Sequence, residues 1–172
     1  ASSQRREDDR GEGVVVQHDR VGFHRAGLPP LSDEGRDVGL GASVERSRSG
    51  NGAHAWFFFS EPIAAAAARK MGCYLITETM SRRHELSLDS YDRLFPSQDT
   101  MPRGGFGNLI ALPLQHGPRQ HGNSVFLDDH LQPYPDDQQW VQLAGVPRLD
   151  RHTVETIAGE ATRRGSVIGV RA

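Results

Sequence analysis

The chain has 172 residues, of which 36% are hydrophobic, and a formal net charge of −2 at pH 7. A chain of this length fits one domain, whose core can bury roughly two thirds of the surface that the unfolded chain exposes. The small net charge excludes an overall basic surface, so any contact with a polynucleotide must be local. Cys73 is the only cysteine, which excludes an internal disulfide and a thiolate zinc site. We expect a cytoplasmic protein without a membrane partner, because no charged-then-apolar leader opens the sequence and no apolar run approaches the roughly 18 residues of a membrane span.

The beginning of the chain contains one clear element. Residues 1–13 carry many charges and a single aliphatic residue, so we expect an irregular segment there. The β-branched run from Val14 to Val16 predicts a short strand that ends in the polar residues after it. Residues 24–36 have neither a helical nor an alternating period and contain two consecutive prolines, which predicts a loop.

A β-hairpin is predicted next. Residues 42–45 look extended, Ser47 to Gly52 form a turn, and Ala53 to Phe59 are strongly strand-like. The aromatic residues of the second strand most simply build the core, although every second ring could face a base. Ser60 then predicts the cap of a helix that begins at Glu61-Pro62, because proline and an acidic residue both suit a first turn. The predicted stripe of this helix comprises Ile63, Ala66, Ala67, Lys70, Met71, Tyr74, Leu75 and Glu78.

Short extended segments and loops are predicted after this helix. One extended segment must end at Pro96, and Asp99 beyond it suits a turn. The glycines of residues 104–107 predict a loop that leads into a buried strand from Leu109 to Leu114. A further short strand is predicted from Val125 to Leu127.

Two helices are predicted near the end of the chain, over Asp136–Leu143 and Asp150–Arg164. The second has an aspartate as its N-cap and Gly165 as its stop. Its predicted buried face comprises Val154, Ile157, Ala158 and Ala161. Four histidines suit surface loops and helix ends rather than a zinc site, and they are His84, His116, His121 and His130.

The sharpest local signal is the string RSRSGNGAHAWFFF at residues 46–59. One interpretation is a hairpin turn and nothing more. The other is a phosphate site, in which glycine amides approach an anion closely and polar side chains add hydrogen bonds. The residues of this site would be Arg46, Arg48, Ser49, Gly50, Asn51, Gly52 and His54.

The segment SGNGAHAW resembles the second signature motif of archaeo-eukaryotic primases, in which a Ser-Gly turn precedes a strand-borne histidine that contacts nucleotide phosphates. Ser49 and His54 hold those positions here. The resemblance extends through ERSRSGNGAHAWFFFSEP, LDSYDRLFPSQDTMPRGGFGNLIALPLQ and GNSVFLDDHLQPYPD, over roughly residues 36–170. These strings are similar to the primase domain of TOTE conflict-system proteins.

This resemblance implies an α/β (α+β) fold of RRM-like primase architecture, with a mostly antiparallel sheet flanked by helices. The expected primase-like domain covers residues 14–149, and a C-terminal helix and the start of a linker follow in residues 150–172. The resemblance also implies metal-dependent addition of nucleotides in intact relatives, as in DNA replication, with nucleoside triphosphates and a DNA template as partners. Such relatives join the domain to helicase and nuclease modules.

Polymerases of this kind hold two divalent cations, Mg²⁺ or Mn²⁺, with carboxylates. The family's first motif, Asp-x-Asp, falls on VVVQHDRVGF, where Asp19 matches the second aspartate and Gln17 stands at the place of the first. For the later acid we prefer Asp92, with Asp89 as the second choice, while turn capping is the alternative role for both. The resemblance thus implies Asp19, Asp92 and His54 as catalytic residues, the two aspartates being the metal ligands.

Two features of the sequence argue against an active enzyme. A glutamine amide lacks the anionic charge that a hard metal pair favours. Residues 24–35 do not resemble the helix that follows the first motif in the family, and we hypothesise a reading-frame disturbance there. The alternatives are therefore a catalytically inactive nucleotide or nucleic-acid binding remnant, or a nonfunctional gene fragment. Asn108, in the GGFGN loop, is expected near the nucleotide or template, unless the loop only leads into a buried strand.

Overall fold

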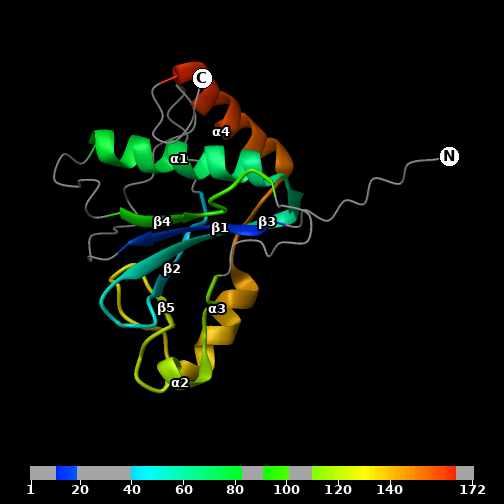
Figure 1. Cartoon of the computed structure of the whole chain (residues 1–172). Coiled ribbons are helices and arrows are strands. Elements are labelled where there is room, and N and C mark those ends of the chain that lie inside the picture. Colours follow the sequence, from blue (N-terminus) through cyan, green and yellow to red (C-terminus); the bar gives the residue numbers. More distant parts are fainter. Residues whose placement is uncertain (1–10, 19–39, 83–90, 101–109, 166–172) are drawn as a thin grey trace.

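The aromatic run after the hairpin turn sets the architecture of the molecule. In the computed structural model, which describes residues 11–18, 40–82, 91–100 and 110–165, the side chains of this run alternate between two cores. Phe57 and Phe59 join a large core, whereas Trp56 and Phe58 join a smaller one. Because successive side chains of a strand point to opposite faces, a strand that is apolar on both faces must be covered on both. Figure 1 shows this arrangement, with helices above and below one sheet.

The described part of the chain forms one six-stranded sheet with the strand order β4-β1-β3-β2-β5, and β6 also pairs with β3. All pairs are antiparallel except the parallel pair of β3 and β6. The strands are β1 (Gly11–His18), β2 (Ser43–Arg46), β3 (Ala53–Ile63), β4 (Tyr91–Phe95), β5 (Phe126–Leu127) and β6 (Arg148–Leu149).

The large core lies between the sheet and two helices, α1 (Ala65–Arg82) and α4 (Arg151–Arg164). Met71 of α1 and Val154 of α4 are fully buried there. At the far end of the pair, Arg164 binds the Glu78 carboxylate and lies over the Tyr74 ring. The two helices therefore form one layer on one face of the sheet, which makes α4 part of the same core as the strands.

The opposite face carries a thinner layer of short elements, α2 (His116–Arg119), the 3₁₀ turn η3 (Asp136–Gln138) and α3 (Gln139–Gly145). Trp56, Leu114 and Phe126 form its buried core. Gln139 is fully buried, and its side-chain amide binds the backbone of Phe126 and Tyr134. Its amide oxygen accepts from the Phe126 N–H at 2.7 Å, and its amide nitrogen donates to the Phe126 and Tyr134 carbonyls at 3.2 and 2.8 Å.

The predicted fold class is confirmed, as an α+β domain with a mostly antiparallel sheet and helices. The predicted strand at Val14–Val16, the hairpin around Ser47–Gly52 and the end of a strand before Pro96 are also confirmed. The helix over residues 151–164 has the predicted cap, because the Asp150 carboxylate accepts from the Thr153 N–H at 2.8 Å, and it ends at Gly165 with a φ of 63°. Its four predicted inward residues are all buried.

The helix predicted to start at Glu61-Pro62 was wrong, because β3 continues to Ile63 and α1 begins at Ala65. Tertiary contacts override the local cap signal here. Ser60 donates to the Leu149 carbonyl, Glu61 pairs with Arg151, and Ile63 is buried. The partner strand shifts register from Gly13 opposite Phe58 to Gly11 opposite Ile63, so Pro62 lies in the irregularity, where its missing N–H costs no ladder bond.

Two further predictions were wrong. Residues 110–114 form no strand; Leu112 is exposed, while Leu114 is buried at a φ of 60° and donates its N–H to Ser124. The irregular segment predicted over residues 1–13 is a strand from Gly11 onward. The helix predicted at Asp136–Leu143 begins with a 3₁₀ turn and extends to Gly145. The predictions for residues 1–10, residues 24–36, the 104–107 loop and His84 lie outside the described residues.

Candidate functional site

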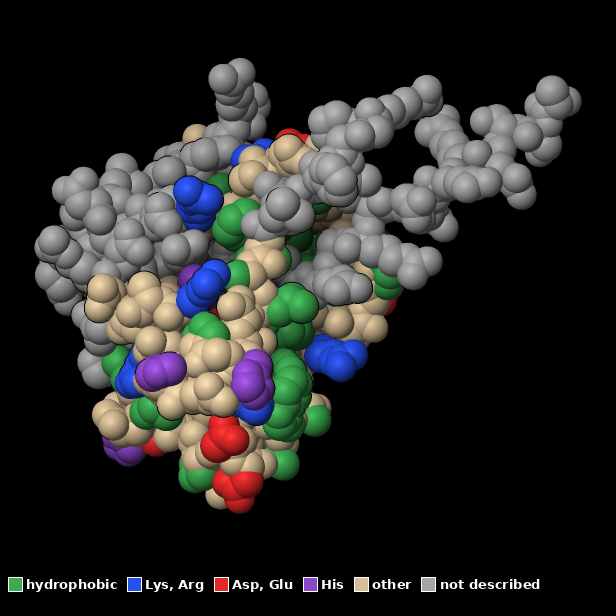
Figure 2. All heavy atoms as spheres, turned by 60° about the horizontal axis from the view of Figure 1, so that its bottom comes forward, with side chains coloured by type: hydrophobic (Ala, Val, Ile, Leu, Met, Phe, Trp, Pro, Cys, Tyr) green, Lys and Arg blue, Asp and Glu red, His purple; other side chains and the backbone are tan. Residues whose placement is uncertain are grey.

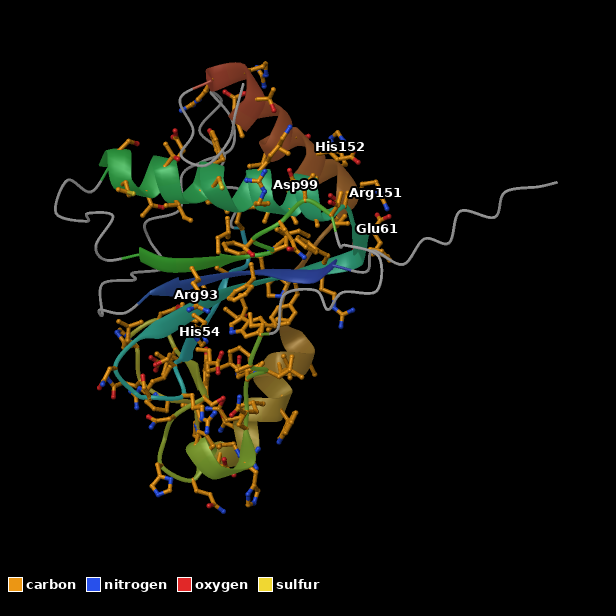
Figure 3. All side chains as sticks on the ribbon, in the orientation of Figure 1. His54, Glu61, Arg93, Asp99, Arg151 and His152 are labelled. Atoms are coloured by element: carbon orange, nitrogen blue, oxygen red, sulfur yellow. The ribbon has the colours of Figure 1, made fainter. Side chains whose placement is uncertain are left out.

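A row of residues crosses four strands of the sheet at the end next to the hairpin turn. Glu45 of β2 pairs with His54 of β3, His54 pairs with Gln17 of β1, and Gln17 pairs with Arg93 of β4. Leu94 joins the core under α1, whereas Phe95 joins the core of the opposite layer, so Arg93 shares the face of Phe95. Figure 3 shows His54 and Arg93 on the side of the sheet away from α1 and α4.

Glu45 is the buried centre of this row, with an exposed fraction of 2%. One carboxylate oxygen accepts from the Trp56 indole N–H at 2.6 Å and contacts the His54 Nδ1 at 3.0 Å. The other oxygen accepts from the Ser124 hydroxyl at 2.9 Å. A buried carboxylate is costly unless it is hydrogen-bonded. Two of the three partners, His54 and Trp56, lie in β3, and Ser124 comes from the opposite layer. The Glu45 side chain is therefore fixed from several directions.

The turn from Ser47 to Gly52 lies immediately beside His54. The Ser47 hydroxyl accepts from the Gly52 N–H at 3.1 Å and is 3.0 Å from the Ser49 hydroxyl. The Gly50 N–H donates to the Ser47 carbonyl at 3.0 Å, and the Ser49 hydroxyl contacts the Asn51 N–H at 3.4 Å. The backbone N–H groups of Gly50 and Gly52 therefore form hydrogen bonds within the turn. The groups that it presents outward are the exposed side chains of Arg48, Ser49 and Asn51.

The opposite layer supports the turn from outside the hairpin. Arg46 donates to the Gly122 carbonyl at 3.1 Å, and the Ser124 N–H donates to the Arg46 carbonyl at 2.9 Å. Gly50 has a φ of 81°, and a Cβ on it would lie 2.7 Å from the Asn123 amide oxygen. The residues 122–124 thus hold both the turn and Glu45, although they are more than seventy residues away in the chain.

The predicted site residues of the hairpin are brought together. Ser49, Gly50, Asn51 and Gly52 form the turn, and Arg46 and Arg48 flank it. His54 follows on the next strand, with only 9% of its surface exposed. Arg46 is only partly available, since one of its guanidinium N–H groups is bound to Gly122.

The predicted metal ligands can be placed only in part. Asp19 and Asp89 lie outside the described residues, and so does Asn108, which was expected near the nucleotide or template. The backbone of Asp92 lies in β4, at a bulge where Gln17 and His18 of β1 face Arg93 and Tyr91, so Asp92 is the additional residue. Bulges often occur beside functional sites. No group of three His, Cys, Asp or Glu side chains suited to a metal ion occurs within the described ranges.

The sequence interpretation missed Glu45, Arg93 and Ser124 as members of the site. A signal for Glu45 was present. A hairpin whose turn runs from Ser47 to Gly52 pairs the residues on either side of it, which places Glu45 opposite His54. A charged residue in a predicted strand, opposite a histidine, is an informative exception to apolar burial. Ser124 left no such signal, because only the tertiary fold brings it to β2.

The described side chains of this face do not fit a pair of divalent cations. Glu45 is the one carboxylate in the row, and its three hydrogen bonds occupy both of its oxygens. The neighbouring positions carry a histidine, a glutamine and an arginine, of which none supplies an anionic oxygen. These donors suit an anionic ligand better than a cation. The histidines of the opposite layer are separate on its surface, as Figure 2 shows, and His116, His121 and His130 are exposed.

The fold and this face define an α+β domain with a candidate ligand site, formed by a hairpin turn and a histidine that a buried carboxylate holds. The chain belongs to the family described as the TOTE conflict system, Archaeo-Eukaryotic Primase domain, whose model matches residues 6–157. The resemblance seen in the sequence strings is thereby confirmed, and the match begins before residue 36 and includes residues 24–35. No curated protein matches the chain. None of the helices in the described ranges is long and apolar enough to cross a membrane.

Proposed function

We propose that this primase-family domain binds a nucleoside triphosphate on the face of the sheet that carries His54. The observation that carries the proposal is the juxtaposition of a fixed histidine, an exposed polar turn and an arginine of the same face. The phosphates would lie between the turn and His54, within reach of Arg48, Ser49 and Asn51. Charge-assisted hydrogen bonds of this kind contribute about 1.5–3 kcal/mol each, before the cost of ordering the groups.

The reaction proposed for intact relatives is nucleotidyl transfer onto a primer paired with a DNA template, with helicase and nuclease modules in the same system. Asp19 and Asp92 are the residues that would hold Mg²⁺ or Mn²⁺ in this chain, and the bound cation would neutralise phosphate charge. Gln17 lies between His54 and Arg93 in the register of the sheet. A neutral amide at this central position supports binding of the triphosphate without efficient transfer.

Two assays on the same preparations test both parts of the proposal. Calorimetry with a deoxynucleoside triphosphate measures binding, and extension of a labelled primer on a DNA template with Mg²⁺ or Mn²⁺ measures transfer. We expect the natural sequence to bind weakly and to extend far less than an intact relative. His54→Ala should lower the affinity by about tenfold or more, the loss expected for a charge-assisted bond. His116→Ala, an exposed histidine of α2, is the matched control and should leave binding unchanged.

The variant Gln17→Asp tests why transfer is weak. It restores a carboxylate at the centre of the row, so we expect measurable primer extension with unchanged triphosphate binding. Strong extension by the natural sequence would contradict the proposed loss of activity and would point to another acid, such as Asp8 or Asp9. A natural sequence that binds no triphosphate would contradict the nucleotide function itself.

The second candidate is a domain that binds nucleotide or nucleic acid and has no transferase activity at all. The same position of Gln17 favours it, because the described row is cationic or neutral outside Glu45. The two candidates differ in one result. Extension by Gln17→Asp supports a primase that lost one ligand, whereas a folded Gln17→Asp variant that binds but never extends supports the binding domain.

A further inference from the structure

The Glu45 carboxylate decides which nitrogen of His54 is free. A carboxylate only accepts hydrogen bonds, and the Trp56 indole only donates. The oxygen that accepts from Trp56 at 2.6 Å also contacts the His54 Nδ1 at 3.0 Å. The Nδ1 of His54 must therefore carry the proton of this contact, and Nε2 is the nitrogen left for a ligand.

The surroundings prevent the histidine from exchanging these roles. Glu45 has 2% of its surface exposed, and its second oxygen is held by Ser124, whose hydroxyl belongs to the opposite layer. The Trp56 and His54 rings pack in a T-shaped arrangement, with the centroids 6.4 Å apart and the planes at 80°. Ser124 itself is buried at a φ of 55°, a backbone conformation that costs free energy and persists only where the surroundings fix it.

We propose that Glu45 is a positioning residue of the phosphate site, which holds His54 through Nδ1 and presents Nε2 to the triphosphate. This inference rests on the proposed nucleotide site and adds the group that orients its histidine. An Nε2 that donates to a phosphate oxygen carries a second proton, so the bound ring is an imidazolium. The negative charge of Glu45 compensates it, while Arg93 is the charged side chain on the β4 side of the row.

Nitrogen NMR of the natural sequence tests the assignment without any substitution near the ring. In protein labelled with ¹⁵N-histidine, with His54→Ala used to identify the signals, the free protein should show a protonated Nδ1. Addition of inorganic triphosphate at constant pH should shift Nε2 to the protonated form and leave Nδ1 protonated. A free ring with its proton on Nε2 and an unprotonated Nδ1 would overturn the proposal, as would a triphosphate-dependent change at Nδ1 alone.

Substitutions of Glu45 give a second, independent readout. Glu45→Gln can keep its carbonyl oxygen toward Trp56 and His54, because the Ser124 hydroxyl can also accept from an amide. It should keep the protonated Nδ1 and bind triphosphate with an affinity between those of the natural sequence and Glu45→Ala. Glu45→Ala should bind as weakly as His54→Ala, about tenfold or more below the natural sequence. Glu61→Gln, an exposed glutamate of β3, is the matched control and should bind normally.

The outcomes separate this inference from the proposed function. Normal triphosphate binding by a folded Glu45→Ala would overturn the positioning role, and so would a folded Glu45→Gln that binds no better than Glu45→Ala. Failure of the natural sequence to bind triphosphate would contradict the proposed function instead. In that case, the nitrogen spectrum of the free protein still decides whether Glu45 holds Nδ1.

Discussion

At the scale of single residues, the sequence predicts the polar turn and His54 but not the groups that hold them. The turn is a local feature, because Ser47, Ser49 and Gly52 bind one another within six residues. Glu45 depends on the hairpin register, which the sequence also contains. Ser124 is different, since its contact with Glu45 joins residues 79 positions apart. Contacts of that kind follow from the packing of the whole molecule and have no local signature.

The left-handed backbone of Gly50 gives a prediction at this scale. We expect Gly50→Ala to destabilise the domain by about 1–2 kcal/mol from the positive φ alone, and by more where the new Cβ meets the Asn123 amide. Chemical denaturation with equal m-values measures this loss. Gly159→Ala is the control, because Gly159 is an exposed position inside α4 with open space around it. There, alanine should stabilise the domain by about 0.5–1 kcal/mol, and equal effects of the two substitutions would contradict the explanation.

At the scale of elements, prediction succeeds where the signals lie within the element. The helix α4 has its cap, its apolar face and its glycine stop in consecutive sequence, and all three are observed. The prediction fails at the end of β3, because Ser60 and Pro62 are typical of a helix start. Contacts with Leu149 and Arg151 keep the chain extended there. The prediction for the segment before Leu114 is wrong for the opposite reason, because a strand was expected where the chain is irregular. Its apolar run suggests a strand, but residues 110–114 are irregular, with Leu114 buried in the smaller core and Ile110 packed against it.

The cap of α4 gives a prediction with a defined pH dependence. The hydrogen bonds from Thr153 lower the pKa of Asp150 below its ordinary value of 3.8. A carboxyl group with a lowered pKa stabilises the folded state above its unfolded pKa, and this contribution disappears as the pH falls through the folded pKa. We expect Asp150→Ala to lower the midpoint of thermal unfolding at neutral pH and to approach the natural sequence in strong acid. Asp150→Asn keeps a capping oxygen without a charge. The difference between the unfolding midpoints of Asp150→Asn and Asp150→Ala should therefore stay constant with pH.

At the scale of the molecule, the site lies on the face of the sheet that carries the thinner layer, and the two layers differ in the size of their cores. The layer of α1 and α4 shares a large core with the sheet, whereas the opposite layer has Trp56, Leu114 and Phe126 as its buried apolar residues. Composition and periodicity predict that such layers exist, but not which of them carries the site. The thin layer supplies Ser124 to Glu45 and the Gly122 carbonyl to Arg46. The geometry of the candidate phosphate site therefore depends on the weaker of the two layers.

This division predicts that the thin layer opens separately when its central hydrogen bonds are removed. Gln139 binds the Phe126 N–H and the carbonyls of Phe126 and Tyr134. Gln139→Leu leaves these backbone groups without that partner, at about 1–3 kcal/mol for each buried group. Native-state hydrogen exchange should then accelerate at the amides of Phe126 and Ser124, while the amides around Met71 in α1 and Ile157 in α4 keep their protection. The affinity of Gln139→Leu for triphosphate should also fall, because Ser124 no longer holds Glu45.

The preceding residue Gln138 supplies the control, since it is the last residue of the 3₁₀ turn η3 and is exposed. Gln138→Leu should change neither exchange nor binding. Gln139→Glu is a sharper variant, because it keeps an oxygen for the Phe126 N–H but turns the second oxygen toward two carbonyls. It should accelerate exchange at least as much as Gln139→Leu. If Gln139→Leu instead accelerates exchange equally in α1, α4 and the thin layer, the two layers unfold as one cooperative unit, and the site is as stable as the molecule that carries it.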